Sequence, residues 1–311
     1  MAPSLKVRDF AAGVDRVEKV FRDRRAIMIF VLPAFIVFSS VVILPIVFSA
    51  YYSLLDWNGA GKSTFIGFSN YIEMFTNPST YFVKGIVNSA ILAGLSIFVQ
   101  VPLALGLALV ISRGVKFEGL FRNVYFIPVI ISTTVIGQLW MKIYHPNNGM
   151  LNILLQNIGL VSWKKSWLGD PVLSLGAVFF VLIWQYIGYH MLLMYSAIKA
   201  IPTTLYEAAE IDGCSKSQLS RHISIPLIMP MIKTCVTFAL IGSLKTFDLI
   251  YVLTKGGPIH ATEVPTTLMF ANIFLNYRYG MGSSMAIFIL LECLLFTVML
   301  QRMFKVEDLE F

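Results

Sequence analysis

The chain has 311 residues, of which 57% are hydrophobic and only 13% are charged, and its formal net charge is +7. Soluble globular proteins carry about 25% charged residues, so the composition excludes a large soluble enzyme, and the high hydrophobicity excludes a disordered chain. The remaining class is a protein that crosses a lipid bilayer several times, in which Lys and Arg on the inner side account for the positive charge without any nucleic-acid partner.

The first 25 residues are charged throughout and contain no apolar core followed by a small-residue cleavage site, so they do not resemble a signal peptide. Phe10, Val14, Val17, Val20 and Phe21 recur at helical spacing between these charges. We therefore expect residues 1–25 to form a cytoplasmic segment with an amphipathic helix on the membrane surface.

Six stretches are long enough to cross the hydrocarbon core, which needs about 20 apolar residues. Four of them carry no charge, namely 26–55, 85–112, 123–141 and 171–198. The stretch 234–253 contains Lys245 and Asp248, and the stretch 279–304 contains Glu292. The sequence therefore predicts an all-α polytopic membrane protein with six transmembrane helices over residues 26–304 and a short tail at 305–311.

The distribution of Lys and Arg orients these spans. With the N-terminus inside, the inner segments hold 16 of them: seven before residue 26, three in 112–122, four in 199–233 and two after residue 300. The outer segments hold five. Since Lys and Arg accumulate on the cytoplasmic side, both termini are predicted to be cytoplasmic.

Residues 59–64 read GAGKST, which is similar to the end of a phosphate-binding loop. The complete pattern requires a glycine five residues before Gly61, and that position is Asp56. The predicted location, directly after a span on the outer side, is also wrong for cytoplasmic ATP. Because His, Cys and acidic residues show no metal-ligand spacing either, the chain is predicted to be non-catalytic and to bind no cofactor of its own.

The inner segment 199–230 is too long and too patterned for a simple connection. Pro202 suits the start of a first helix, Asp212 and Gly213 suit its end, and Ser215 suits the cap of a second helix. Acidic side chains stand beside small alanines in the first helix, which permits close approach of a partner. The residues favour a docking element, with a solvated linker as the alternative.

Glu207-Ala208-Ala209, Asp212-Gly213, Ile223 and Pro226 together resemble the EAA loop of binding-protein-dependent ABC transporter permeases. Residues 121–132 (FRNVYFIPVIIS), 167–171 (WLGDP) and 247–258 (FDLIYVLTKGGP) are similar to the sugar-uptake branch, the maltose-type permease family. The resemblance covers about residues 27–304. Cys214 stands where alanine is usual, Ile225 replaces leucine, and the large periplasmic insertion of the maltose protein is absent.

This resemblance implies the fold of a type I ABC importer permease in a bacterial or archaeal inner membrane. It implies a heterodimer with a second permease, two copies of a cytoplasmic ATPase that binds ATP and Mg, and an extracytoplasmic solute-binding protein. The EAA loop is the coupling helix in this family, and it inserts into a cleft of the ATPase. Carried over, the coupling residues are Glu207, Ala208, Ala209, Asp212 and Gly213.

Ionisable residues inside a membrane usually face a bundle interior or an aqueous cavity. Lys245 and Asp248 are spaced i to i+3, which would place them on one helical face. The family resemblance adds sugar-contacting positions on the fourth and fifth spans. The predicted substrate residues are Tyr186, Tyr189, Ser243, Lys245, Thr246 and Asp248.

Two questions stay open at this level. Lys245 and Asp248 could instead form an internal ion pair that only orders the helix, and Glu292 could either line the cavity or pack against a partner. The leading function is uptake of a sugar, such as an oligosaccharide or glycoside, by an ATP-driven importer. The alternatives are a glycerol-phosphate or polyol permease of the same class and an ion-coupled secondary transporter.

Overall fold

The computed structural model describes residues 24–303. The predicted amphipathic segment 1–25 lies almost entirely outside these residues, and the tail 305–311 lies wholly outside them. The chain divides into two compact units, residues 1–52 and residues 53–311.

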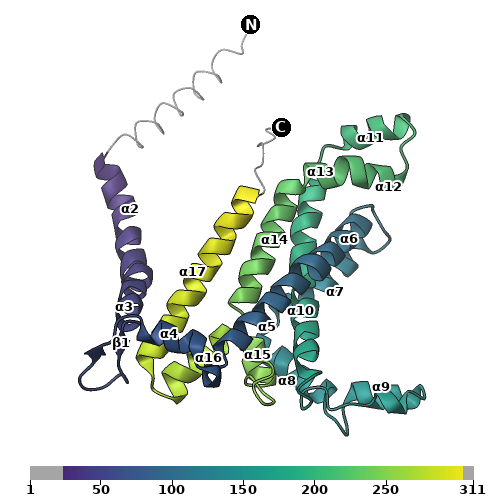
Figure 1. Cartoon of the computed structure of the whole chain (residues 1–311). Coiled ribbons are helices and arrows are strands. Elements are labelled where there is room, and N and C mark those ends of the chain that lie inside the picture. The colour runs from purple at the N-terminus through teal and green to yellow at the C-terminus, as the bar shows by residue number, and fades with distance from the viewer. Residues whose placement is uncertain (1–23, 304–311) are drawn as a thin grey trace. The chain divides into compact units, whose positions relative to one another are not determined.

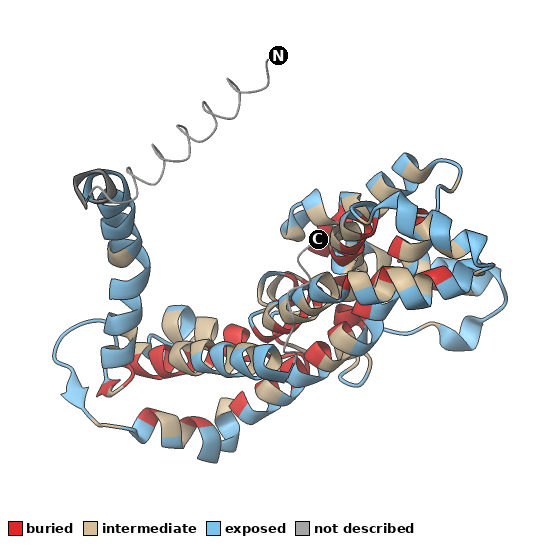
Figure 2. Ribbon diagram, turned by 90° about the horizontal axis from the view of Figure 1, so that it is seen from above, coloured by how far each residue is buried: buried red, intermediate tan, exposed pale blue. Residues whose placement is uncertain are grey.

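The first unit is one apolar helical run. It consists of α2 (Arg24–Phe38), the π-helical turn η1 (Ser39–Ile43) and α3 (Leu44–Tyr52). Pro45 has no N–H to donate to the carbonyl of Val41, and a π turn at this point accommodates the missing bond. From Met28 to Tyr52 the side chains are mostly exposed (Figure 2), as expected of a helix whose solvent is lipid.

The second unit is mainly helical, and its one sheet among the described residues is a short antiparallel hairpin (Figure 1), in which β1 (Leu55–Asp56) pairs with β2 (Thr64–Phe65). Its long helices are α5 (Phe82–Leu95), α6 (Val101–Ile111), α7 (Glu118–Ile130), α8 (Thr133–Ile143), α10 (Ser174–Lys199), α14 (Met229–Leu244) and α17 (Tyr279–Met303). The short elements are α4 (Ser69–Thr76), η2 (Pro78–Thr80), η3 (Ser96–Gln100), α9 (Met150–Asn157), η4 (Val161–Trp163), α11 (Thr203–Ile211), α12 (Lys216–Leu219), η5 (Ser220–Ser224), α13 (Ile225–Leu227), α15 (Asp248–Leu253), α16 (Pro265–Phe270) and η6 (Ala271–Leu275).

The described residues confirm an all-α polytopic chain. Four helical runs are individually long and apolar enough to cross a bilayer, and the number rises to six if each of two bent helix pairs is one span. The bent pairs are Glu118–Ile130 with Thr133–Ile143, at 98°, and Lys216–Leu227 with Met229–Leu244, at 70°. The count of six spans and the cytoplasmic location of both termini remain predictions.

Two predicted spans are not continuous helices. The stretch 123–141 breaks at Ile131 and Ser132, where the backbone is extended. Pro128 lies one turn before this break, and it removes a hydrogen bond from the helix that would otherwise continue. The stretch 234–253 breaks after Leu244, and the Thr246 carbonyl there accepts a hydrogen bond from the Thr266 hydroxyl of α16.

The second break corrects one expectation. Lys245 follows the end of α14, and Asp248 begins α15. The two residues therefore do not share a face of one helix, because the residues between them are not helical.

The core of this unit is built around α10, which packs against α6, α7 and α14. Figure 2 colours the buried residues of this unit red. On α10 they include Val178, Met191 and Met194, whose exposed fraction is 0%. Gly188 lies where α10 meets α7, and a Cβ atom added to it would overlap the backbone carbonyl of Tyr125. This close approach fixes the position of α10, which carries one wall of the larger cavity of this unit.

Candidate functional site

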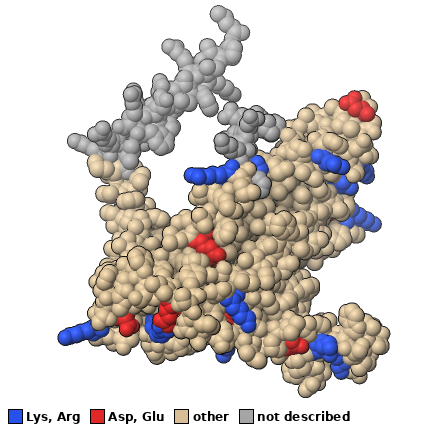
Figure 3. Space-filling model, in the orientation of Figure 1, with Lys and Arg blue, Asp and Glu red and all other residues tan. Residues whose placement is uncertain are grey.

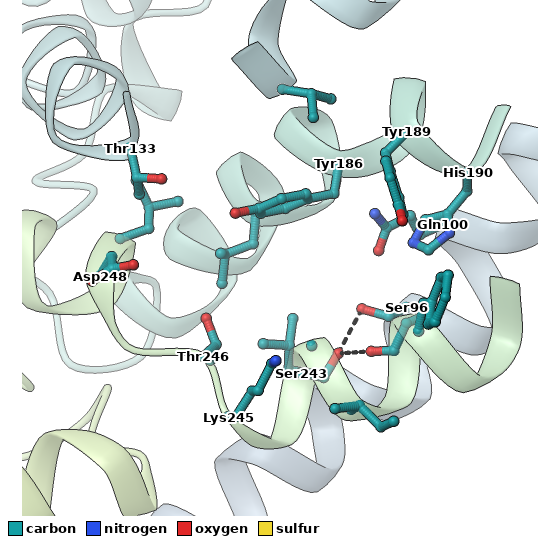
Figure 4. Close-up of a pocket in the computed structure, with 18 of the residues that line it drawn as sticks. Ser96, Gln100, Thr133, Tyr186, Tyr189, His190, Ser243, Lys245, Thr246 and Asp248 are labelled. Atoms are coloured by element: carbon teal, nitrogen blue, oxygen red, sulfur yellow. Dashed lines mark hydrogen bonds between the residues drawn. The ribbon is translucent and has the colours of Figure 1, made fainter. Parts of the chain in front are cut away.

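A cavity of about 480 Å³ opens between α5–η3, the α7–α8 pair, α10 and the α14–α15 break (Figure 4). The structure brings all six predicted substrate residues to its lining. They are Tyr186, Tyr189, Ser243, Lys245, Thr246 and Asp248. Glu292 lies on α17 outside the lining of this cavity, so the structure separates it from the six.

The wall formed by α10 is aromatic. Tyr186 and Tyr189 are three residues apart and therefore lie on one face of the helix, and both line the cavity. Phe238 of α14 lies opposite, with its ring centre 6.3 Å from that of Tyr189. Flat aromatic faces that carry a hydroxyl offer both an apolar surface and a hydrogen bond to a ligand.

Both helix breaks open onto this cavity. Thr133 at the start of α8 lines it, as does the whole segment from Lys245 to Asp248. Irregular backbone at membrane depth is tolerated where it lines a cavity or is buried in protein, and discontinuous helices are typical of transporter binding sites. The geometry therefore suits the binding of a polar ligand in an apolar protein.

Lys245 and Asp248 each have a local reason to be charged. Lys245 follows the C-terminal end of α14, and Asp248 lies in the first turn of α15. A cation is stabilised at a helix C-terminus and an anion at a helix N-terminus. The ion pairs among residues 24–303 do not include one between these two side chains.

The turn η3 supplies two cavity residues that were not predicted. Ser96 and Gln100 both line the cavity and are buried, and the Ser243 hydroxyl donates to the Ser96 oxygen at 3.0 Å. Pro102 cannot donate to the carbonyl of Phe98, which accounts for the π turn at this point. A glutamine inside an apolar stretch two residues before a proline was the available signal.

On α10 two further polar side chains are buried and incompletely hydrogen-bonded, and one of them, His190, lines the cavity. Gln185 and His190 are 1% and 4% exposed, and within the described residues Gln185 Oε1 and His190 Nδ1 have no hydrogen-bond partner. His190 lines the cavity beside the amide of Gln100, as Figure 4 shows. Leaving a buried polar group unpaired costs about 1–3 kcal/mol, a cost that a polar ligand can remove at His190.

The predicted coupling residues lie elsewhere, on the loop that follows α10 (Figure 1). Glu207, Ala208 and Ala209 belong to α11, and Asp212 ends that helix. Gly213 has a φ of +80°. Its N–H donates to Glu210 O at 3.0 Å, and the next N–H donates to Ala209 O at 3.0 Å, which is the Schellman arrangement that favours glycine.

The second predicted helix of this loop is also present. The Ser215 oxygen accepts from the Gln218 N–H, and Gln218 Oε1 accepts from the Ser215 N–H at 2.8 Å. This reciprocal capping box begins α12, so the expected pair of short helices joined by a turn is confirmed. Within α10, Tyr189 and Lys199 are separated by about 15 Å of helix axis at 1.5 Å per residue, so a single rigid helix connects the cavity to the loop.

Comparison with known proteins places these features in context. Residues 100–306 match the family described as "Binding-protein-dependent transport system inner membrane component". The probable ABC transporter permease protein YurN of Bacillus subtilis is 38% identical over 280 residues, covering 89% of this chain and 95% of the relative. The diacetylchitobiose uptake system permease protein NgcF of Streptomyces coelicolor is 29% identical over 280 residues, covering 86% and 78%.

Solved structures support the same architecture. The crystal structure of a bacterial alginate ABC transporter in complex with an alginate pentasaccharide-bound periplasmic protein contains a chain that matches with a TM-score of 0.80. The two chains are 23% identical, and the match covers 92% of this chain and 96% of that one. The predicted permease fold of an ABC importer is therefore confirmed.

Proposed function

Because the chain belongs to the family of inner-membrane components of binding-protein-dependent transport systems, we propose that it is the permease subunit through which an ATP-driven importer takes up a sugar. Its relatives are transport subunits, and the chain is accordingly a permease and not an enzyme. The observation that carries the proposal is the cavity at two helix breaks, lined by tyrosines, hydroxyls and a buried histidine.

The chemistry of the cavity favours an oligosaccharide or glycoside. Tyr186 and Tyr189 offer aromatic faces for sugar rings, while Gln100, Ser243 and Thr246 offer hydrogen bonds to hydroxyl groups. The volume of about 480 Å³ lies within the range of small-molecule pockets. A relative named for diacetylchitobiose uptake supports this substrate class.

Other substrates fit less well. A glycerol phosphate would need several cations, but Lys245 is the one Lys or Arg in the described lining, and Asp248 stands three residues away. Polyol uptake fits the hydroxyl donors but leaves the aromatic wall without a role. The ion-coupled secondary transporter is disfavoured by the family, whose members depend on a binding protein.

The loop after α10 is the part of the chain proposed to contact the ATPase. We infer that Glu207, Ala208, Ala209, Asp212 and Gly213 contact a cytoplasmic ATPase subunit, on which ATP and Mg bind. Two copies of that ATPase, a second permease and an extracytoplasmic solute-binding protein complete the importer. The exposed position of α11 beyond the end of α10 (Figure 1) supports this arrangement. Co-purified complexes in vesicles should hydrolyse ATP faster when sugar and binding protein are added, and ATPase activity of this chain alone would contradict the proposal.

Replacement of Asp248 by alanine is expected to lower sugar uptake about tenfold or more while leaving assembly intact. The carboxylate is exposed to the cavity and is not part of an ion pair among the described residues, so its loss removes ligand contacts without unpairing a buried partner. A hydrogen bond to a charged group contributes about 1.5–3 kcal/mol, and 1.4 kcal/mol corresponds to a factor of ten.

The measurement is uptake of labelled sugar into vesicles, normalised to the amount of assembled complex. Asp56→Ala is the matched control, because Asp56 is an exposed carboxylate of the β1–β2 hairpin and does not line the cavity. Full uptake by the Asp248→Ala variant would remove this residue from the site.

A further inference from the structure

A second cavity, of about 290 Å³, lies beneath the proposed coupling helices. It is enclosed by the C-terminal ends of α6 and α10, the segment after α6, and α11, α12 and η5. None of its lining residues belongs to the sugar cavity. Its volume is at the lower limit of pockets that hold small molecules, so it is large enough for a compact polar group.

Positive charge dominates the lining. Arg113, Lys199 and Lys216 contribute cations, and Glu210 is the one acid among the residues that line the cavity. Lys199 is already paired with Glu118, at 3.0 Å between Nζ and Oε1. The charge left for a ligand therefore comes from Arg113 and Lys216, which come from two segments far apart in the sequence.

Arg113 is held in place by the loop it faces. Its Nη2 atom donates to Lys216 O at 3.1 Å and to Ser220 Oγ at 2.6 Å. A guanidinium has five N–H donors in a fixed planar fork, and both of these bonds use the same nitrogen. Its other donors keep a defined direction, which is the geometry that suits an oxyanion.

The backbone of Lys216 has a fixed position at the start of α12. Lys216 is the first residue of α12, directly after the capping box formed by Ser215 and Gln218. Its ammonium group is exposed and is not part of an ion pair among residues 24–303.

Five residues with hydroxyl groups also line the cavity, namely Ser112, Thr203, Tyr206, Ser220 and Ser224. The hydroxyls of Ser112 and Ser220 donate to backbone carbonyls. Those of Tyr206 and Ser224 bond to each other, which leaves one of their two protons for an oxyanion.

We propose that this cavity binds a phosphate group that carries net negative charge, between Arg113, Lys216 and the neighbouring hydroxyls. Two sources share this chemistry: the headgroup of an anionic phospholipid in the inner leaflet, and free inorganic phosphate. The charges on the surface favour the approach of an anion to this cavity. Lys and Arg gather over α12 and the α6–α7 connection, while acidic side chains lie at the end that α11 forms (Figures 1 and 3). Basic pockets between membrane helices on the cytoplasmic side are suited to lipid headgroups.

A bound phosphate would join two parts of the chain. Arg113 follows α6, and Lys216 belongs to the loop between α10 and α14. The ligand would therefore hold this loop against the end of α6, in addition to the hydrogen bonds that Arg113 donates to the loop.

The test measures binding rather than transport, so it stands apart from the sugar proposal. The full-length chain with its co-purifying subunits is placed in nanodiscs of phosphatidylcholine alone or with phosphatidylglycerol, in phosphate-free buffer. Retained lipid is counted by native mass spectrometry, and melting temperature is measured in both nanodiscs. A second arm titrates inorganic phosphate into the phosphatidylcholine nanodiscs.

We expect the melting temperature of the complex to rise in one of the two arms. Each cation removed should weaken binding at least about fivefold, so Lys216→Gln should lose less binding than the double variant Arg113→Gln/Lys216→Gln. The control is Lys62→Gln/Lys84→Gln, which removes the same charge from exposed positions outside the cavity. A response to phosphatidylglycerol alone identifies a headgroup site, and a response to inorganic phosphate identifies a free-anion site. No response in either arm, or an equal response in Lys216→Gln, would overturn the proposal; this single variant leaves the Arg113 contacts and the fold in place.

Discussion

Replacing Glu207 by lysine is expected to abolish most of the coupling between ATP hydrolysis and transport, with at least about a tenfold loss of uptake, while the chain folds and inserts normally. Glu207 is exposed on α11 and is not part of an ion pair among the described residues, so the substitution leaves no partner unpaired within this chain. In the proposed complex, a reversed charge would face the ATPase groups that complement the carboxylate. Disrupting a charge pair at an interface costs about 2–5 kcal/mol.

The measurement is the ATPase rate of the reconstituted complex with and without sugar-loaded binding protein, together with uptake by the same vesicles. Glu207→Gln should show a smaller loss, since it removes the charge without reversing it. Asp56→Lys provides the control, because it reverses an exposed acid on the β1–β2 hairpin, far along the chain from α11. Unchanged stimulation of ATP hydrolysis in the Glu207→Lys complex would contradict the assigned role of α11.

Gly188→Val is expected to destabilise the protein by about 3 kcal/mol, because overpacking at a tight contact forces the backbone to move. A Cβ at residue 188 would overlap the carbonyl of Tyr125, which is a backbone atom and cannot turn away. The substitution must therefore move α10 away from α7. Since α10 carries the aromatic wall and leads into the coupling loop, we expect uptake to fall together with stability.

Stability is measured as the melting temperature of the purified complex and as the fraction that elutes as a single species in size-exclusion chromatography. Gly176→Ala is the matched control on the same helix. A Cβ there meets no atom within 4 Å, and replacing a helical glycine by alanine is favourable by about 0.5–1 kcal/mol. A Gly188→Val variant that melts and elutes like the parent protein would show that the contact between α7 and α10 is not tight.

Local rules predicted the coupling loop well, because its structure is determined by neighbouring residues. Gly213 ends α11 because its left-handed φ of +80° closes a Schellman arrangement, and Ser215 begins α12 through a capping box. The apolar stretches and the family resemblance likewise predicted the all-α fold and the six residues that meet at the cavity.

The break between α14 and α15 could not be predicted in the same way. The stretch 234–253 contains no proline or glycine next to Leu244 that would indicate the end of a helix there. The Thr246 carbonyl accepts its hydrogen bond from the Thr266 hydroxyl, which is 20 residues further along the chain and cannot be inferred from local sequence. The π turn at η3 also prevented a prediction, in this case of which side chains face the cavity. An extra residue in a helical turn rotates the following side chains by about 100°, so the direction of Ser96 and Gln100 could not be read from an ideal helix.

The two breaks also have a mechanical consequence. α8 and α15 pack directly on each other, and a Cβ on Gly137 of α8 would overlap Val252 of α15. Each of these helices is joined to its neighbour, α7 or α14, by non-helical residues at the edge of one cavity. The two helices also share one buried cluster with α10, through Ile136 on α8 and Ile250 on α15. A substitution that moves either helix is therefore expected to displace both breaks together, and with them the cavity residues Thr133 and Asp248.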